Sequence, residues 1–302
     1  MGASAKTVQG LARWLERCNA REAVIKELVP FTITGHDKPL GYMLPSFAEV
    51  LLGYQDVFQS GQAAGSKTVT LHPQLRGFEE RTAAVDRVLV ELQGKGVVNG
   101  WRGERYPVLS SFHSPPLLAL ERAAAVSFGI KAYGVHINGF VRMPDGALEM
   151  WVATRSRTKP TWPGRLDQMV AGGQPVGISC EDNVKKECWE EAGVPRELAA
   201  QAEPVGAVSY AAMQSAGLKR DVLFCYDLEL PLDFTPTPQD DEVESFERWP
   251  MARLIEEVAH GDRFKDNCNL VIIDFFFRHG LVAPDTPGYL ELLTGLRGGD
   301  CC

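Results

Sequence analysis

The sequence predicts a mixed α/β (α+β) protein with two domains, and three observations support this prediction. The chain has 302 residues, and because domains commonly contain about 100–200 residues, two domains are expected. Hydrophobic residues make up 45% of the chain and charged residues 23%, which is typical of proteins that bury a core. Segments with helical spacing of apolar residues are interspersed with segments of strand-like alternation. We expect an α+β domain over residues 1–130, a second domain over residues 131–285 and a C-terminal tail over residues 286–302.

The first of these regions contains three predicted helices and one hairpin. Helical spacing predicts helices over residues 7–18, 81–94 and 117–125. The second is the clearest, because its apolar residues recur at i, i+3, i+4 and i+7 (Val85, Val88, Leu89 and Leu92). Gly35, His36, Asp37, Lys38 and Pro39 separate two short apolar runs, which indicates a hairpin turn.

A second hairpin is predicted to open the C-terminal domain over residues 133–154. Apolar and polar residues alternate on both sides of a Pro144-Asp145-Gly146 turn. His136 lies in this stretch and His113 lies before it, and either could be a ligand or a base. Neither has a partner His or Cys at metal-ligand spacing, which favours structural roles for both.

Charge and composition exclude several classes of function. The chain carries 31 Lys and Arg against 39 Asp and Glu, and this net charge of −8 disfavours a nucleic-acid polymer or an anionic membrane as partner. Its most apolar run, residues 270–277, is too short to cross a bilayer and contains Asp274. The start of the chain lacks the apolar core of a secretory signal, and the seven scattered cysteines fit reduced thiols. We therefore expect a cytoplasmic protein.

Residues 172–194, here called the box segment, carry the pattern that points to chemistry. Ser179 followed by Asp182 predicts a helix start, and Gly193 predicts its end about thirteen residues later. On this helix Glu187, Glu190 and Glu191 share an arc of about 100° beside the apolar face. A solvated acidic face is the alternative, but the Gly172-Gly173 pair would let the backbone approach a ligand closely. Carboxylates on one rigid face suit Mg²⁺ bound to a diphosphate.

The box segment resembles the Nudix box. The family pattern is Gly, five residues, Glu, seven residues, then Arg-Glu-aliphatic-any-Glu-Glu-any-Gly-aliphatic, and six of its nine defined positions match here: Gly172, Glu187, Glu190, Glu191, Gly193 and Val194. Ile178 replaces the first Glu, Lys186 replaces the Arg and Cys188 replaces the aliphatic residue. In the family, the first Glu and the Arg mainly support the geometry of the loop and helix. The resemblance therefore implies that metal binding is retained.

The flanking sequence narrows the resemblance. Residues 151–173 resemble Nudix proteins related to fungal thiamine pyrophosphokinase-associated Nudix domains and their plant relatives. Residues 101–106, 121–124, 128–130 and 133–136 resemble the extra N-terminal domain of that subgroup. The downstream stretches 241–246 and 274–280 also resemble the subgroup. This resemblance implies a Nudix α/β/α sandwich with a mixed sheet, preceded by a smaller α+β domain. The N-terminal domain is a candidate for substrate selection or for the contacts of a homodimer.

The resemblance also implies the roles of individual residues. Glu187, Glu190 and Glu191 are expected to bind Mg²⁺, with Mn²⁺ as a possible substitute, and one of them could be the base that activates water. Glu242 is a candidate additional ligand or base, although a solvated acidic loop is an equal alternative. Arg155 and Lys159 could neutralise the diphosphate, beside Gly172 and Gly173 of the loop. Surface charge at a strand end is an equal alternative for the two cations.

The sequence thus predicts a Mg²⁺-dependent hydrolase that cleaves the diphosphate linkage of a small organic or nucleoside diphosphate. The subgroup implies thiamine diphosphate or its damaged analogues, and the wider family leaves an 8-oxo-guanine nucleoside diphosphatase as an alternative. A second alternative is a non-catalytic Nudix-fold binding protein, suggested by Ile178 and Lys186. A third, an isomerase of the isopentenyl-diphosphate type, is disfavoured because its catalytic Cys motif is not seen.

Overall fold

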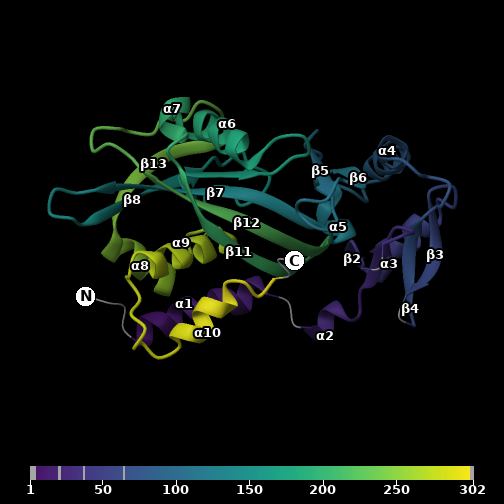
Figure 1. Ribbon diagram of the computed structural model, residues 1–302, viewed down its shortest axis with the longest axis horizontal. Helices are drawn as coiled ribbons and strands as arrows, with labels where there is room; N and C mark the ends of the chain where they lie inside the picture. Colours follow the sequence, from purple (N-terminus) through teal and green to yellow (C-terminus); the bar gives the residue numbers. More distant parts are fainter. Residues whose placement is uncertain (1–4, 20–21, 37, 64, 300–302) are drawn as a thin grey trace.

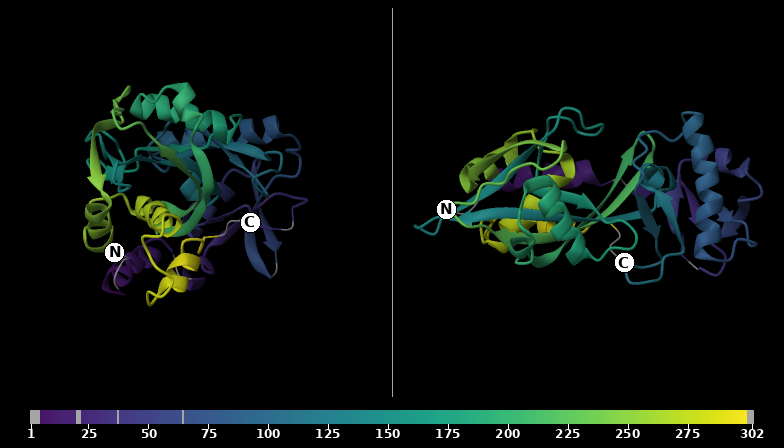
Figure 2. Two further views of the ribbon diagram at one scale, coloured as in Figure 1. Left: turned by 60° about the vertical axis from the view of Figure 1, so that its left-hand side comes forward. Right: turned by 90° about the horizontal axis from the view of Figure 1, so that it is seen from above.

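The computed structural model describes residues 5–19, 22–36, 38–63 and 65–299. The chain forms a larger lobe around a seven-stranded sheet and a smaller lobe around a four-stranded sheet, with a two-stranded sheet between them (Figure 1). Seen from above, the two lobes lie side by side (Figure 2). The predicted mixed α/β fold is confirmed.

The larger lobe is built on a mixed sheet. Its main strands follow the order β11-β12-β7-β8-β13, while β10 pairs with β7 and β9 pairs with β8. The central neighbours β7 and β12 run parallel, and the other pairs are antiparallel. The strand bounds are β7 (Lys131–Arg142), β8 (Leu148–Arg155), β9 (Leu166–Asp167), β10 (Val170–Gly173), β11 (Glu203–Gln214), β12 (Gly217–Glu229) and β13 (Val243–Pro250).

Helices cover both faces of this sheet. On one face lie α6 (Cys180–Ala192) and α7 (Arg196–Ala199), and on the other lie α8 (Met251–His260) and α9 (Asp266–Arg278) (Figure 1). Below α8 and α9, the first helix α1 (Ala5–Cys18) lies beside α10 (Tyr289–Gly295). The apolar face of α1 is buried in the same core as α8 and α9. The start of the chain therefore packs with its end, and the segment expected to be a tail contains a packed helix.

The smaller lobe has its own hydrophobic core. Its sheet has the order β2-β1-β4-β3, with β1 and β4 parallel. The remaining elements are α2 (Glu22–Ile25), β1 (Val29–Thr32), β2 (Gly41–Met43), α3 (Pro45–Leu52), β3 (Phe58–Ala63), β4 (Ser66–Leu71), α4 (Phe78–Gly94), β5 (Arg105–Val108), β6 (Leu118–Glu121), the 3₁₀ helix η1 (Arg122–Ala124) and α5 (Ala125–Phe128).

Most of the predicted elements are confirmed. The structure contains the first two predicted helices as α1 and α4, and both hairpins. Asp37 of the first turn lies outside the described residues, and Gly146 of the second turn takes a φ of 84° that favours glycine.

The helix predicted over residues 117–125 is wrong. Residues 118–121 form strand β6, paired with β5, and helical turns begin only at Arg122. Leu118, Ala119 and Leu120 are all at most 1% exposed, because β6 is covered on both faces. A short run buried on both faces has no periodicity that separates a strand from a helix.

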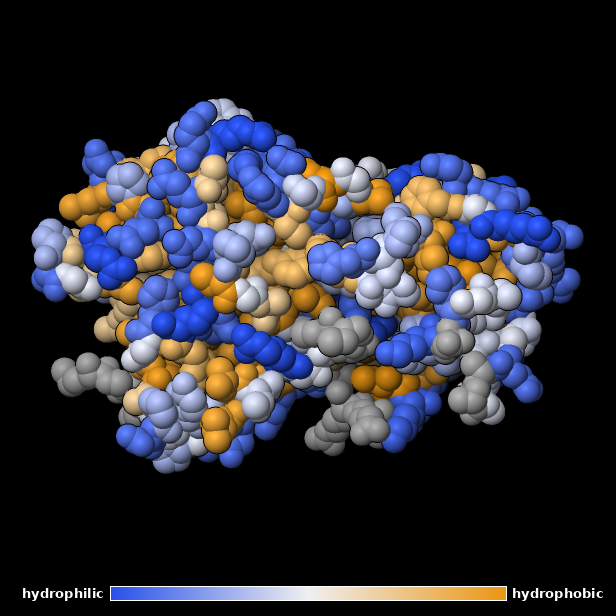
Figure 3. Space-filling model, viewed as in Figure 1, coloured by the Kyte–Doolittle hydropathy of each residue, from blue (hydrophilic) through white to orange (hydrophobic). Residues whose placement is uncertain are grey.

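Hydrophilic and hydrophobic residues are interspersed over the face of the molecule in Figure 3. Within the described residues, every helix is either too short or too polar to traverse a lipid bilayer.

Candidate functional site

Helix α6 holds the three glutamates of the box segment in place. The Ser179 hydroxyl accepts a hydrogen bond from the Asp182 N–H at 3.0 Å, and Gly193 ends the helix with a φ of 61°. Both ends lie where the sequence predicts them. Along the helix Glu187 and Glu191 are buried, whereas the Glu190 side chain is 45% exposed.

The two glycines of the box segment make room for side chains of the protein itself. A Cβ atom on Gly172 would lie 2.3 Å from Cδ of Glu187, and one on Gly173 would lie 1.9 Å from the Tyr106 hydroxyl oxygen. Any other residue at these positions would push Glu187 or Tyr106 away. Gly172 and Gly173 therefore fit Glu187 and Tyr106 against strand β10; the sequence suggests instead that the backbone approaches a ligand here.

A buried asparagine ties α6 to this strand. Asn183 Nδ2 donates to the Gly173 carbonyl at 2.8 Å and to Gln174 Oε1 at 3.0 Å. The sequence analysis did not identify Asn183 as a site residue. Its position four residues before Glu187, on the same face of the predicted helix, is a signal that could have indicated it.

Lys186 lies between two of the glutamates. Its ammonium is 3.0 Å from Glu187 Oε1 and 2.9 Å from Glu190 Oε2. Burial acts to lower the pKa of Lys186, but the two carboxylates outweigh it and raise the pKa. A positive charge is thus stable between Glu187 and Glu190, in the position where the family pattern has Arg.

Glu191 is the most isolated charge of the site. Its Oε2 accepts a hydrogen bond from the Ala171 N–H at 2.8 Å, but within the described part of the chain it forms no ion pair. Burial and repulsion by Glu187 raise its pKa well above the usual value. Burial likewise raises the pKa of Glu187, with Lys186 partly offsetting it. A buried carboxylate oxygen without a cation is a fitting ligand for a hard divalent ion.

The other predicted site residues lie on the neighbouring strands and loops. Lys159 forms an ion pair with Glu242. Burial alone would raise the pKa of Glu242, but the bond to Lys159 outweighs it and lowers the pKa. The Glu242 charge also contributes to the raised pKa of Glu191, so the two carboxylates belong to one electrostatic environment.

Arg155 is engaged within the protein. Its Nη1 donates to Asp167 at 2.7 Å, while Nε and Nη2 donate to backbone carbonyls of Trp162 and Thr161 at 3.1 and 3.0 Å. Its side chain is 11% exposed. Arg155 therefore supports the loop after β8.

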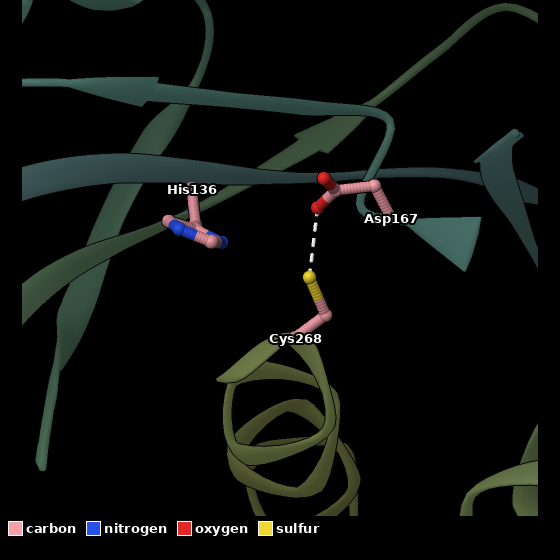
Figure 4. Close-up of side chains that lie close together, drawn as sticks. All are labelled: His136, Asp167 and Cys268. Carbon is pink, nitrogen blue, oxygen red and sulfur yellow. Dashed lines mark hydrogen bonds between the residues drawn. The ribbon is translucent and has the colours of Figure 1, made fainter. Parts of the chain in front are cut away.

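A second buried cluster joins His136 of β7, Asp167 of β9 and Cys268 of α9 (Figure 4). Among the described residues, this is the one His/Cys/Asp/Glu triad whose ligand atoms all lie within 4.8 Å of one another, so the three box glutamates do not converge to that degree. The Cys268 thiol donates to Asp167 at 2.7 Å, and His136 Nδ1 lies 2.8 Å from Gln168 Oε1.

The charges in this second cluster are already balanced. Burial would raise the pKa of Asp167, but the cations Lys265 and Arg155 outweigh it and lower the pKa. Burial also lowers the pKa of His136 to about 4 and keeps the Cys268 thiol protonated. The residue types of this cluster are ones that bind metals. A metal ion would nevertheless have to compete with Arg155 and Lys265 for Asp167, so the charges disfavour metal binding here. Sequence spacing did not reveal the cluster because its members come from three separate elements.

Comparisons with known proteins match both parts of the chain. Residues 10–132 match a domain of unknown function, DUF4743, and residues 132–267 match the NUDIX domain. Two Arabidopsis thaliana proteins, "Nudix hydrolase 24, chloroplastic" and "Nudix hydrolase 20, chloroplastic", are each 47% identical to this chain. Their alignments span 292 and 297 residues, which in each case is 97% of this chain and 79% of the relative.

A solved structure resembles the larger lobe only distantly. The NUDIX domain of Shewanella oneidensis NrtR in complex with ADP ribose is 17% identical, with a TM-score of 0.40 over 50% of this chain and 90% of that one. A likeness of this level bears on neither substrate nor mechanism.

Proposed function

Because this chain belongs to the Nudix hydrolase family and is a Nudix-type diphosphate hydrolase, we propose that its box glutamates hold a divalent ion, Mg²⁺ or Mn²⁺, for that reaction. Nudix hydrolases generally use divalent metals. The observation that carries the proposal is the buried Glu191 carboxylate, which has Glu187 beside it and no cation of the protein against it among the described residues. Divalent-ion binding would relieve this repulsion.

Each residue of the site has a distinct proposed role. Glu187, Glu190 and Glu191 are the proposed ligands, and the bound ion would neutralise diphosphate charge and favour water as nucleophile. Asn183 and the Ala171 N–H keep the helix and strand β10 in register around them. Glu242, which stays charged through its pair with Lys159, is the proposed base that accepts a proton from water.

We propose thiamine diphosphate or its damaged analogues as the substrate. The support is the resemblance to thiamine-associated Nudix proteins, which lies in residues 101–106, 121–124, 128–130, 133–136, 151–159 and 162–173. An 8-oxo-guanine nucleoside diphosphate is the second candidate, and the relatives' names specify neither. A homodimer, a cytoplasmic location, the domain division near residue 130 and the lack of nucleic-acid or membrane partners stay predictions.

Activity assays test the metal site directly. The wild type and Glu191→Gln are assayed for phosphate release from thiamine diphosphate, oxidised thiamine diphosphate and 8-oxo-guanine nucleotides, with and without Mg²⁺. We expect Mg²⁺-dependent turnover that falls about 100-fold or more in Glu191→Gln, since a metal supplies several kcal/mol of charge stabilisation. Glu181→Gln is the matched control, because Glu181 is on the same helix and its side chain is 79% exposed.

Equal activity of the wild type and Glu191→Gln would contradict the metal assignment. If only the nucleotides were hydrolysed, an 8-oxo-guanine nucleotide and not thiamine diphosphate would be the substrate. If a compound were bound but none were hydrolysed, the non-catalytic alternative would be favoured.

Thermal unfolding gives a second measurement that does not depend on the substrate. Mg²⁺ at about 100 times its Kd should stabilise the wild type by about 2.7 kcal/mol, because it binds only the folded state. Glu191→Gln should lose most of this stabilisation, and Glu181→Gln should keep it. An equal Mg²⁺ effect on all three proteins would place the ion elsewhere.

A further inference from the structure

Strands β5 and β6 bring residues from before the NUDIX match to the edge of the box segment. The Val176 N–H of the box segment donates to the Arg105 carbonyl of β5 at 3.0 Å. The next residue of β5, Tyr106, packs its hydroxyl against Gly173, where a Cβ would lie 1.9 Å away. Gly173 adjoins Gly172, which contacts Glu187. In Figure 1 the two strands lie at the junction of the lobes, near the end of the larger sheet.

This junction fixes an ion pair between Glu104 and Arg122. Arg122 Nη1 lies 2.7 Å from Glu104 Oε2, and the Arg122 N–H donates to the Glu104 carbonyl at 2.8 Å. Glu121, which is 3% exposed, accepts backbone N–H bonds from Arg102, Gly103 and Ala123 at 2.8, 3.1 and 3.2 Å. One buried carboxylate therefore clamps both segments that carry the pair.

The Arg122 guanidinium uses only part of its hydrogen-bond donors within the described residues. Glu104 takes Nη1, while Nε and Nη2 donate to no group of the protein within the described residues. The side chain is 45% exposed, and its guanidinium carbon lies 5.5 Å from the centre of the Tyr106 ring, which limits where the group can move. A fixed, partly exposed guanidinium with open donors is suited to bind phosphate oxygens.

Four cations of the larger lobe lack this freedom. Arg155 uses Nε, Nη1 and Nη2 inside the protein, and Lys159 is paired with Glu242. Lys186 bridges two of the box glutamates, and Lys265 lies 3.5 Å from Asp167. The sequence predicts that Arg155 and Lys159, in the C-terminal half, neutralise the diphosphate. Both are engaged within the protein, whereas Arg122 in the N-terminal half keeps donors open for a ligand.

Electrostatic coupling supports this placement. The Arg122 charge contributes to the lowered pKa of Glu242, although burial and Lys159 have larger effects. The Glu104 charge contributes, behind burial and the Glu190 charge, to the raised pKa of Glu187. The contacts themselves place the pair at the edge of the box segment, because Arg122 lies at the ring of Tyr106 and the Tyr106 hydroxyl lies against Gly173, next to Gly172.

We propose that Arg122 binds the diphosphate of the substrate, so that the region before the NUDIX match completes the active site of the larger lobe. This inference rests on the proposed function, because it assumes that the diphosphate lies against the box glutamates. Glu104, Glu121 and Tyr106 are positioning residues that hold the guanidinium toward that place.

Kinetics and binding of the full chain test the proposal. Arg122→Ala and Arg122→Lys are compared with the wild type on the diphosphate that the wild type hydrolyses, and methylenediphosphonate with Mg²⁺ serves as a probe that cannot be cleaved. Arg87→Ala is the matched control, since Arg87 also pairs with one carboxylate, Asp56, on the surface of the smaller lobe. Circular dichroism checks that each variant folds.

We expect Arg122→Ala to raise KM and the Kd of methylenediphosphonate about tenfold or more, with a smaller change in kcat, because a charged hydrogen bond is lost. Arg122→Lys should recover part of the loss, and Arg87→Ala should match the wild type. Wild-type KM and Kd in folded Arg122→Ala would overturn the proposal, as would a wild type that does not bind methylenediphosphonate. A wild type that binds the probe through Arg122 but hydrolyses nothing would contradict the proposed function alone.

Discussion

Two buried carboxylates of the larger lobe, Asp167 and Glu191, differ in how their charge is balanced. Asp167 has Arg155 at 2.7 Å, Lys265 at 3.5 Å and the Cys268 thiol at 2.7 Å. Glu191 has one backbone N–H and a neighbouring carboxylate, Glu187. The pKa of Asp167 is accordingly lowered, while that of Glu191 is raised well above its usual value. The protein supplies cations for Asp167, whereas among the described residues no cation pairs with Glu191.

The largest expected effect tests this comparison through stability. Asp167→Asn should lower the free energy of unfolding by about 3–5 kcal/mol, because it leaves Arg155 and Lys265 buried without their anion. Glu191→Gln should leave stability unchanged or raise it in the absence of Mg²⁺, since it removes a buried charge and keeps an acceptor for the Ala171 N–H. Urea unfolding at neutral pH in EDTA measures both. An equal loss of stability in the two variants would contradict the difference in charge balance between Asp167 and Glu191.

The balanced cluster should also respond to acid through His136. Burial and the Lys265 charge lower the pKa of His136 from 6.5 to about 4. Below pH 6.5 the unfolded chain binds a proton that the folded chain does not, so stability is complete above pH 6.5 and is lost as the pH falls toward 4. The difference corresponds to about 3 kcal/mol.

Unfolding measured between pH 7 and 4 checks this prediction. His136→Asn, which keeps a donor for Gln168, should flatten the pH dependence by about that amount. The same change at the exposed His113 should leave the wild-type pH dependence intact. A steep wild-type slope in His136→Asn would assign the acid sensitivity to other groups.

The smallest expected effect concerns Glu190, the exposed glutamate of the box segment. Glu190→Gln should change the free energy of unfolding by no more than about 0.5 kcal/mol, because its pair with Lys186 is half-exposed and screened. Its Mg²⁺-dependent activity should still fall if Glu190 is a ligand. Chemical denaturation measures the effect on stability, and the phosphate-release assay measures the effect on activity. If Glu190→Gln lost as much stability as Asp167→Asn, burial would not be what determines how much a carboxylate contributes to stability.

The box segment illustrates how much of the site is local. A cap at Ser179, a left-handed glycine at 193 and the helical repeat place Glu187, Glu190 and Glu191 on one face, and all of this can be predicted from short-range spacing. The internal hydrogen bonds of Arg155 could not be predicted, because its partner Asp167 belongs to another strand and its other acceptors lie in a loop. Strand β6 was mistaken for a helix because its burial on both faces depends on distant elements.

The mixed α/β class, the capped helix and the identity of its carboxylates follow from local sequence patterns, because these features depend on residues within one or two turns of each other. Which charges are paired, by contrast, depends on the packing of elements that are distant in the sequence. This packing joined α1 to α10 near opposite ends of the chain and matched Asp167 with Arg155 and Lys265. It also brought Arg122 to the ring of Tyr106, whose hydroxyl lies against Gly173. Such pairings depend on how sheets and helices pack, and no local pattern encodes the partner across the fold.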